Sequence, residues 1–462
     1  MSVEQSETSL PLQLFTFDTW EGFTRQRLQI NYENTLALWY SLPPGLPLGK
    51  QNVKYYTRTQ QRNRLRKLKL YAFYCTLLNR SFLKKKVRAR GFKLWNSTLN
   101  VPDTQDDSLY SIYAKLGGIT EQFMAKGEQY DSTINYEELF KAGRTVWFMI
   151  AFQIQMNIKM TLTDSIFGYN MLYPYTDDLV DSNDITNESK KDFAKVFFER
   201  LLYGDIDQPK DADPPKFLGD RTPADSRLPS SLTAHADRVG KIFDMVKFIE
   251  NDWSRLKYKE VYYGLATIHE CQMKSTLQHA TDDYIPQLKT IEEISAQKGG
   301  ASLIAAGFLI EGTLTYEKMA HLEYLGFGLQ LLDDLQDVQE DLKNNHRTIF
   351  TQAICDHQSL DIPTGKLIQY YFCSRAGDKF EEDKLINQSA NATNTVTLAQ
   401  YVRISMVNFS LLLILEAASK LEQYYSKQFY HDLNTLSPLS LKDLAVARIE
   451  DRIFNIVRHQ WF

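Results

Sequence analysis

The sequence has few of the features that mark secreted, zinc-binding or membrane-spanning proteins. Only four of its 462 residues are cysteines, and they are scattered without Cys-x-x-Cys or Cys/His spacing. A disulfide framework or a zinc site is therefore not expected, and a reducing cytosol fits this composition. The first residues lack the basic start and apolar run of a signal peptide. The most apolar stretches, 145–160 and 404–417, are too short and interrupted to span a bilayer. We expect a soluble, cytoplasmic protein.

Period-two alternation of polar and apolar residues is also missing, so nothing in the sequence indicates a β-sheet. Apolar residues instead recur at helical spacing over 136–172, 238–345 and 398–460. Hydrophobic residues make up 43% of the chain and charged residues 24%, a balance that leaves ample material for a core. The sequence therefore predicts an all-α fold.

The domain organisation follows from composition along the chain. We expect one large helical domain over 136–462, preceded by a basic and partly helical N-terminal extension over 1–135. Five of the 14 prolines fall between 204 and 237, together with many Asp and Ser residues. That stretch is predicted to be a loop insertion.

Acidic residues are absent from the stretch 50–93, which carries 15 Lys and Arg residues and is called the basic segment below. Its apolar positions predict one or two helices over 54–93. One hypothesis is a binding protein that uses this segment on nucleic acid or on an anionic membrane. The alternative is a helical face packed near the mouth of an active site.

Two aspartate clusters of the same form lie 156 positions apart: Asp177-Asp178-Leu-Val-Asp181 and Asp333-Asp334-Leu-Gln-Asp337. In a helix, carboxylates at i, i+1 and i+4 share one face. Two such faces turned toward each other would form a cage of oxygen ligands for Mg²⁺ ions that hold a diphosphate. The alternative for each cluster is a solvated acidic face, and for the first cluster Thr176 or Asp177 could cap a new helix.

The second cluster lies in a stretch, 321–342, that is predicted to be one helix. A roughly 100° arc of that helix contains the following residues: Gly326, Gln330, Asp333, Asp334, Asp337 and Asp341. Asp341 therefore extends the predicted metal site. A glycine in mid-helix costs about 1 kcal/mol, so Gly326 suggests that something approaches closely there.

Basic and flexible residues flank the clusters. Lys298-Gly299-Gly300 is predicted to kink a helix and expose backbone groups to a ligand, with an interhelical turn as the alternative. Lys343 and Arg347 follow the second cluster and could bind a diphosphate. The alternative is that they are surface cations at a helix C-terminus. Gln272 is a candidate pocket-facing residue on the preceding helix.

Together these residues resemble the class I isoprenoid synthases: trans-prenyl diphosphate synthases, squalene and phytoene synthases, and class I terpene cyclases. The resemblance covers roughly 40% of the chain and is best over 262–350. There the motifs Cys271-Gln272, Lys298-Gly299-Gly300-Ala301, Gly326-x-x-x-Gln330-x-x-Asp333-Asp334-x-x-Asp337 and Arg347 follow the order of the prenyl synthase motifs GQxxDL, KTxAL, GxxxQxxDDxxD and a closing lysine.

The resemblance implies a single helical bundle around a central cavity, with three Mg²⁺ ions between the aspartate helices. It implies metal binding by Asp177, Asp178, Asp181, Asp333, Asp334, Asp337 and Asp341, of which Asp177, Asp178, Asp333 and Asp337 are catalytic. It implies substrate binding by Lys298, Gln330, Lys343, Arg347 and Gln272. The reaction would be ionisation of a prenyl diphosphate to a carbocation.

The chain departs from the family in two places and contains one misleading match. The first cluster is followed by Ser-Asn-Asp-Ile-Thr rather than the Arg-Arg-Gly of chain-elongating synthases, and their GGKR-type N-terminal site is absent. The run Asn251-Asp252-Trp253-Ser254, with Glu260 beyond it, mimics the Asn/Ser/Glu triad of cyclases. Its serine comes one position early, so we interpret it as a decoy.

These features favour a terpene synthase that cyclises or eliminates the carbocation. The alternative is a prenyltransferase that joins two isoprenoid diphosphates, by elongation or by squalene/phytoene-type coupling. The expected partner is a small-molecule prenyl diphosphate, and nucleic acid is not expected. Contact of the basic segment with a membrane surface and a homodimer are further hypotheses.

Overall fold

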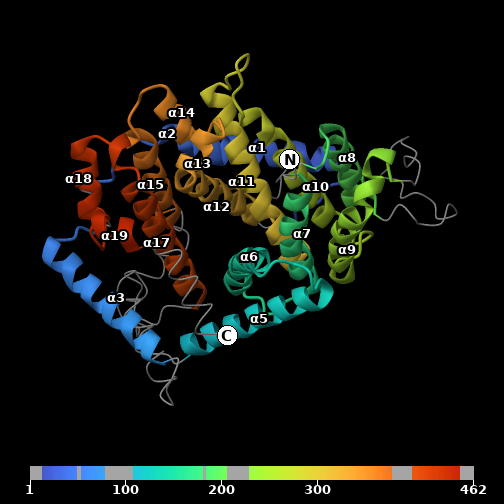
Figure 1. The fold of residues 1–462 in the computed structure, drawn as a ribbon, viewed down its shortest axis with the longest axis horizontal. Helices are drawn as coiled ribbons and strands as arrows, with labels where there is room; N and C mark the ends of the chain where they lie inside the picture. Colours follow the sequence, from blue (N-terminus) through green and yellow to red (C-terminus); the bar gives the residue numbers. More distant parts are fainter. Residues whose placement is uncertain are drawn as a thin grey trace, which may run out of the picture.

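The structure, a computed structural model, describes residues 13–48, 54–78, 108–180, 184–204, 228–376 and 398–447. Over these residues the chain is helical and contains no strand (Figure 1). The prediction of an all-α fold is therefore confirmed. Residues 79–93, most of the 204–237 insertion and the end of the last predicted helical segment lie outside the described residues.

The helices in chain order are α1 (Trp20–Ile30), the π-helix η2 (Asn31–Leu36), α2 (Ala37–Ser41), α3 (Arg58–Leu78), α5 (Ser108–Tyr130), α6 (Tyr136–Gln155), α7 (Asp164–Val180), α8 (Asn187–Tyr203), the 3-10 helix η3 (Ser230–His235), α9 (Ala236–Asp252), α10 (Lys259–Lys274), the 3-10 helix η4 (Ser275–Gln278), α11 (Leu288–Glu311), α12 (Tyr316–Gln336), α13 (Val338–Lys343), α14 (Ile349–Cys355), α15 (Asp361–Ala376), α17 (Leu398–Ser419), the 3-10 helix η7 (Glu422–Tyr424), α18 (Lys427–Leu436) and α19 (Leu441–Ala447).

The apolar segment 136–172 forms two helices rather than one. α6 ends at Gln155, and Asn157 takes a positive φ of 57° that stops the helix. The side chain of Gln153 then bonds to both the N–H and the carbonyl of Thr161, at 3.0 and 3.1 Å. These bonds fold the connection back, so that α7 packs against α6.

α11 and α12 pack closely at the centre of the molecule because glycines face each other across the contact. A Cβ atom on Gly299 would lie 2.3 Å from the carbonyl oxygen of Gly326, and one on Gly326 would lie 2.2 Å from that of Gly299. α11 runs without a break from Leu288 to Glu311. The alternative of an interhelical turn at Lys298-Gly299-Gly300 is therefore wrong, and the predicted exposure of the backbone to a ligand is wrong as well, because both glycines are buried against α12. The close approach inferred at Gly326 is that of a helix, not of a ligand.

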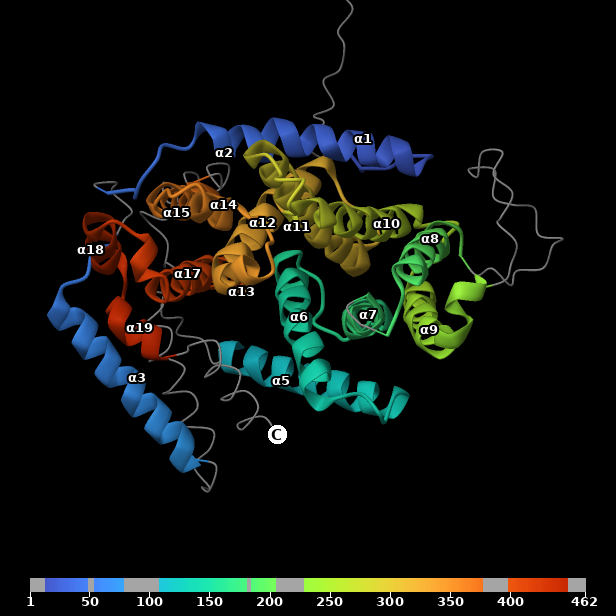
Figure 2. The same cartoon turned by 45° about the horizontal axis from the view of Figure 1, so that its top comes forward.

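The first helices lie across the bundle (Figure 2). A buried ion pair and hydrogen bonds connect them to it. Arg27 of α1 forms an ion pair with Glu323 of α12, and their side chains are 1% and 0% exposed. Asn31 also donates to Glu323, at 2.8 Å, and Trp39 donates to Glu292 of α11, at 2.9 Å. Residues 13–48 therefore pack with the helices that follow residue 136.

Two apolar clusters form the core, and α12 contributes residues to both. The larger one includes residues of α5 to α12, and the smaller one includes residues of α12 to α19. Within the described chain, one stretch of α17, Tyr401–Ser419, is long and apolar enough to cross a membrane by length and composition. Half of that stretch is buried inside the protein.

Candidate metal centre

The second aspartate cluster lies at the junction of α12 and α13. Asp333 and Asp334 are in the last turn of α12, and Asp341 is in α13. The predicted single helix over 321–342 is interrupted at Asp337, which belongs to neither helix. The Asp337 N–H still donates to the Asp333 carbonyl at 3.0 Å, and the Asp341 N–H donates to the Asp337 carbonyl at 2.9 Å. The four carboxylates therefore follow one continuous path of helical turns.

These four carboxylates are close enough to repel one another. Asp334 is buried, Asp341 is half-buried, and Asp333 and Asp337 are exposed. Burial, opposed in part by a hydrogen bond from Gln330 and increased by repulsion from Asp333, raises the pKa of Asp334 to about 7. Burial and then repulsion from Asp334, Asp337 and Asp333 raise the pKa of Asp341 to about 7. Repulsion among neighbouring carboxylates therefore adds to burial in raising both pKa values.

Two of the predicted substrate-binding residues lie at this cluster. Gln330 donates to Asp334 at 2.8 Å, and Ser295 of α11 donates to the other oxygen of Asp334 at 3.2 Å. Lys298 lies one turn after Ser295 on α11, and its charge lowers the pKa of Asp334. The structure therefore brings Lys298 and Gln330 to the aspartates.

The other predicted substrate-binding residues differ in their placement. Lys343 is exposed at the end of α13, and Arg347 is half-buried just beyond it. Gln272 is exposed near the end of α10. Among the described contacts none joins Gln272 to the aspartates, and its neighbour Cys271 instead accepts a hydrogen bond from Arg27 at 3.7 Å.

A histidine pair beside Arg347 was missed by the sequence analysis. His279 and His346 lie with ring nitrogens 3.4 Å apart, next to an N–H···O bond of 2.8 Å from Arg347 to Gln278. Burial, then His279 and Lys298, lower the pKa of His346 to about 4. The pair fixes the segment after α10 against the segment after α13. No spacing could reveal it, because 67 positions separate the two histidines.

The first aspartate cluster ends α7. Pro174 lies inside this helix, and Asp177 and Asp178 are in its last turn, so the alternative in which Thr176 or Asp177 starts a new helix is wrong. Thr176 instead donates back to the carbonyl of Leu172 at 2.8 Å. The side chains of Asp177 and Asp178, and all of Asp181, lie outside the described residues.

The direction of α7 can be read from its contacts with α11. Ser165 of α7 bonds to the carbonyl of Leu309 at 3.2 Å, and one turn later Tyr169 hydrogen-bonds to Ser302. α7 therefore runs antiparallel to α11, and its C-terminal end points toward the N-terminal half of α11, which includes Lys298.

α12 is antiparallel to α11 as well. Gly300 lies against Glu323, Gly299 against Gly326, and Ser295 against Asp334. The two aspartate clusters thus end parallel helices that flank the same part of α11. That their carboxylates face each other stays a prediction.

The donor set can be tested against a metal ion. Within the described residues no three His, Cys, Asp or Glu side chains are arranged around one ion position. Carboxylates on one helical path cover only one side of an ion, so the remaining ligands must come from another segment or from the substrate. Carboxylate oxygens are hard donors, which suit Mg²⁺ better than softer metals. The residues fit Mg²⁺ on these grounds.

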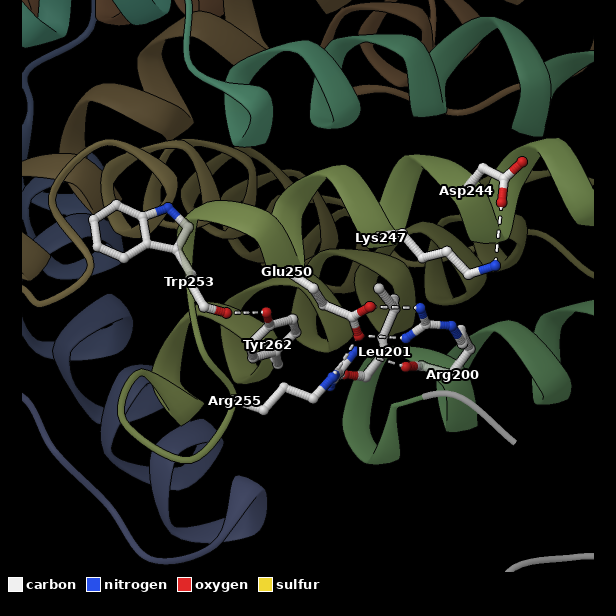
Figure 3. Close-up of polar contacts among 8 residues, drawn as sticks. All are labelled: Arg200, Leu201, Asp244, Lys247, Glu250, Trp253, Arg255 and Tyr262. Carbon is white, nitrogen blue, oxygen red and sulfur yellow. Dashed lines mark hydrogen bonds and ion pairs between the residues drawn. The ribbon is translucent and has the colours of Figure 1, made fainter. Parts of the chain in front are cut away.

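A second group of charges, at the end of α9, is structural. Figure 3 shows Glu250 between Arg200 and Arg255, with bonds of 2.6 and 2.7 Å to Arg200 and 2.6 Å to Arg255. Arg255 also donates to the carbonyls of Leu201 and Arg200 and stacks on Tyr262. Glu250 thus binds both arginines, and the backbone carbonyls take up further N–H groups of Arg255.

The run 251–254 that mimics a cyclase triad, and Glu260 beyond it, also make hydrogen bonds that support the fold. Asn251 donates to Asp164 at 2.9 Å, Asp252 accepts from the N–H of Ser165 at 2.6 Å, and Trp253 donates to the Leu309 carbonyl at 2.9 Å. Glu260 accepts from the N–H of Phe17 at 3.1 Å. These contacts hold α7, α9 and α11 together and agree with its interpretation as a decoy.

Comparisons of this chain with protein-family models, with curated proteins and with solved structures find no match.

Proposed function

We propose that the protein is a Mg²⁺-dependent class I terpene synthase, built as an isoprenoid synthase bundle around a central cavity. The observation that carries this proposal is the arrangement about α11. Parallel helices α7 and α12 both end in an aspartate cluster, and both run toward the N-terminal half of α11, where Lys298 and Ser295 lie. This arrangement suits a substrate whose charged head binds at one end and whose apolar tail lies along the helices.

In this proposal Asp333 and Asp337, which are exposed, hold the metal ions together with the first cluster. When bound, Mg²⁺ supplies the positive charge that stabilises the departing diphosphate. Lys298 adds positive charge at the same end, where negative charge develops in the transition state. Gln330 and Ser295 fix the orientation of Asp334 through their hydrogen bonds.

The apolar part of the substrate would lie beside the preceding turns of α12 and α7. Leu325 and Leu329 precede Asp333 by two turns and one turn, and both pack against the larger apolar cluster. Tyr169 belongs to the same surroundings on α7. An aromatic face contributes about 0.5–2 kcal/mol to stabilising a cation when water is excluded.

A coupling prenyltransferase is the alternative, and the second motif favours it. Gly326, Gln330 and Asp333 stand in the order of a chain-elongating synthase. In the structure Gln330 supports Asp334 directly, as a metal-site residue of either enzyme class could.

Incubation of the purified protein with Mg²⁺ and geranyl, farnesyl or geranylgeranyl diphosphate, with and without isopentenyl diphosphate, tests the proposal. Hydrocarbon or alcohol formed from one substrate alone supports a cyclase. Product that requires isopentenyl diphosphate refutes the cyclase and supports the alternative.

The variant Asp333→Ala should abolish turnover while circular dichroism and melting temperature stay unchanged. Glu317→Ala, at the other exposed end of the same helix, is the matched control and should keep activity. Absence of diphosphate release from every substrate, or an unaltered rate in Asp333→Ala, would reject both isoprenoid functions.

A further inference from the structure

α3 presents a surface of one charge sign to the outside of the molecule. Five of its cations are exposed and form the basic face of α3: Arg58, Arg62, Arg66, Lys67 and Lys69. The helix contains no Asp or Glu. Figures 1 and 2 show α3 along one edge of the molecule, beside α18 and α19.

The opposite side of α3 fixes this orientation. Gln61 is buried and donates to the carbonyls of Asn434 and Ser437, at 2.7 and 3.0 Å. Leu65 and Leu68 pack against the smaller apolar cluster, and the N–H of Tyr56 donates to the Thr435 carbonyl at 2.8 Å. The helix is therefore held by one side, and its cations are directed outward.

Within the described part of the chain, no carboxylate is paired with the cations of this face. Among the described residues, none of its five cations forms an ion pair. Arg58, Arg62 and Arg66 follow each other at i, i+4, and like charges at this spacing destabilise a helix. An anionic partner would remove that repulsion.

Exposed apolar side chains beside the cations indicate which partner this is. Leu70 of α3 is 47% exposed, and Tyr55, three residues before the first arginine of α3, is 45% exposed. Cations with neighbouring leucine and tyrosine suit a bilayer surface, where phosphate groups lie above an apolar layer. A nucleic-acid backbone offers the phosphates without that layer.

We propose that the basic face of α3 docks the protein on a membrane surface rich in anionic lipid. Each Lys or Arg near such a surface increases binding about fivefold, and salt weakens the attraction. This inference is independent of the proposed enzymatic function, because it uses none of the residues of the metal centre.

Co-sedimentation of the full-length protein with vesicles tests it, with phosphatidylcholine alone compared with a mixture of phosphatidylcholine and phosphatidylserine. The wild type should bind only the mixed vesicles. The variant Arg62→Gln/Arg66→Gln/Lys69→Gln should lose binding on the order of a hundredfold. Lys191→Gln/Lys195→Gln/Lys247→Gln removes the same charge from exposed positions of α8 and α9 and should bind like the wild type.

Two further arms separate lipid from nucleic acid. Leu70→Ser should weaken vesicle binding while its circular dichroism stays unchanged. A fluorescent DNA duplex should bind less tightly than the mixed vesicles at equal salt. Vesicle binding that is absent, or equal in the α3 and control variants, would overturn the proposal. Tight duplex binding that only the α3 variant loses would assign the face to nucleic acid.

Discussion

At the scale of single residues, carboxylates in this protein occur in two electrostatic settings. Glu250 and Glu323 are each matched by arginine side chains, Arg200 and Arg255 for the first and Arg27 for the second. Asp334 and Asp341 instead lie beside other carboxylates, and burial with this repulsion raises their pKa to about 7. Carboxylates paired with arginine serve the fold, whereas neighbouring carboxylates that repel one another suit a cation supplied from solution.

The matched setting predicts a large cost when Glu250 loses its charge. Glu250→Ala leaves Arg200 and Arg255 without their anion, and removing one partner of a buried pair costs about 3–5 kcal/mol. The free energy of unfolding in urea should fall by that amount. Asp244→Ala, which breaks the exposed Asp244–Lys247 pair also seen in Figure 3, should cost about 0–1 kcal/mol. Equal losses in the two variants would contradict a structural role for Glu250.

The raised pKa of Asp334 predicts an unusual dependence of the free energy of unfolding on pH. Burial raises the pKa of Asp334 from its ordinary value of 3.8 to about 7, so the metal-free folded protein holds this proton more tightly than the unfolded chain. The contribution of Asp334 to stability is therefore present below pH about 4 and is lost as pH rises toward 7. Each pKa unit corresponds to about 1.4 kcal/mol.

Asp334→Asn removes this titration, so the metal-free variant should become more stable than the wild type by a few kcal/mol as pH rises from 5 to 8. Urea unfolding in the presence of a chelator, at several pH values, measures the difference. Glu317→Gln on the same helix is exposed and should show no such trend. A constant difference between Asp334→Asn and the wild type across this range would mean that Asp334 is charged throughout.

At the scale of elements, the molecule depends on the contact between α11 and α12. Gly326→Ala would place a Cβ atom 2.2 Å from the carbonyl oxygen of Gly299, which is backbone and cannot rotate away. The helices must separate, and such overpacking typically costs about 1–3 kcal/mol. Gly240→Ala is the control, because Gly240 lies in α9 with nothing within 4 Å of the new atom.

Urea unfolding should show a loss for Gly326→Ala and a gain of about 0.5–1 kcal/mol for Gly240→Ala, since alanine favours a helix. The separation of α11 from α12 should also lower activity, because Lys298 and Ser295 lie next to Gly299 and Asp334 accepts from Ser295. A Gly326→Ala protein with unchanged free energy of unfolding would show that α11 and α12 can separate at little cost.

The same elements show what the sequence could predict. Helical periodicity over 321–342 placed Gln330 and the four aspartates on one side, and the structure gathers them there despite the interruption at Asp337. Periodicity could not tell what a glycine faces, so Gly299 was predicted to expose its backbone to a ligand when its partner is Gly326.

Contacts between residues far apart in the chain could not be predicted from the sequence for the same reason. Arg27 and Glu323 are separated by 296 positions, and no local pattern connects them. Thr176 or Asp177 was considered as the start of a new helix. Both lie inside α7, where the Thr176 hydroxyl bonds to the carbonyl of Leu172. Local residue patterns thus identified candidate ligands. The hydrogen bonds and ion pairs that position the helices carrying them arise from tertiary packing.

At the scale of the whole molecule, α11 relates the two aspartate clusters to each other. It runs antiparallel to α7 and to α12, so both helices lead toward the N-terminal half of α11, which includes Lys298. Helices that approach the same end can share ions only if their carboxylates face each other. A binding measurement can decide this, because groups that hold one set of ions act as a unit.

Mg²⁺ with inorganic pyrophosphate should stabilise the wild type and raise its melting temperature. The free energy of unfolding should increase by about 2.7 kcal/mol when the ligand concentration is 100 times its dissociation constant. Asp333→Asn and Asp177→Asn should each remove most of this rise. Their combination should remove no more than either alone, because either loss already disrupts the shared ions. Glu317→Asn, away from both clusters, should respond like the wild type. A full response in Asp177→Asn with none in Asp333→Asn would mean that α12 binds its ions without α7. The proposed enzyme would then lack the second half of its metal centre.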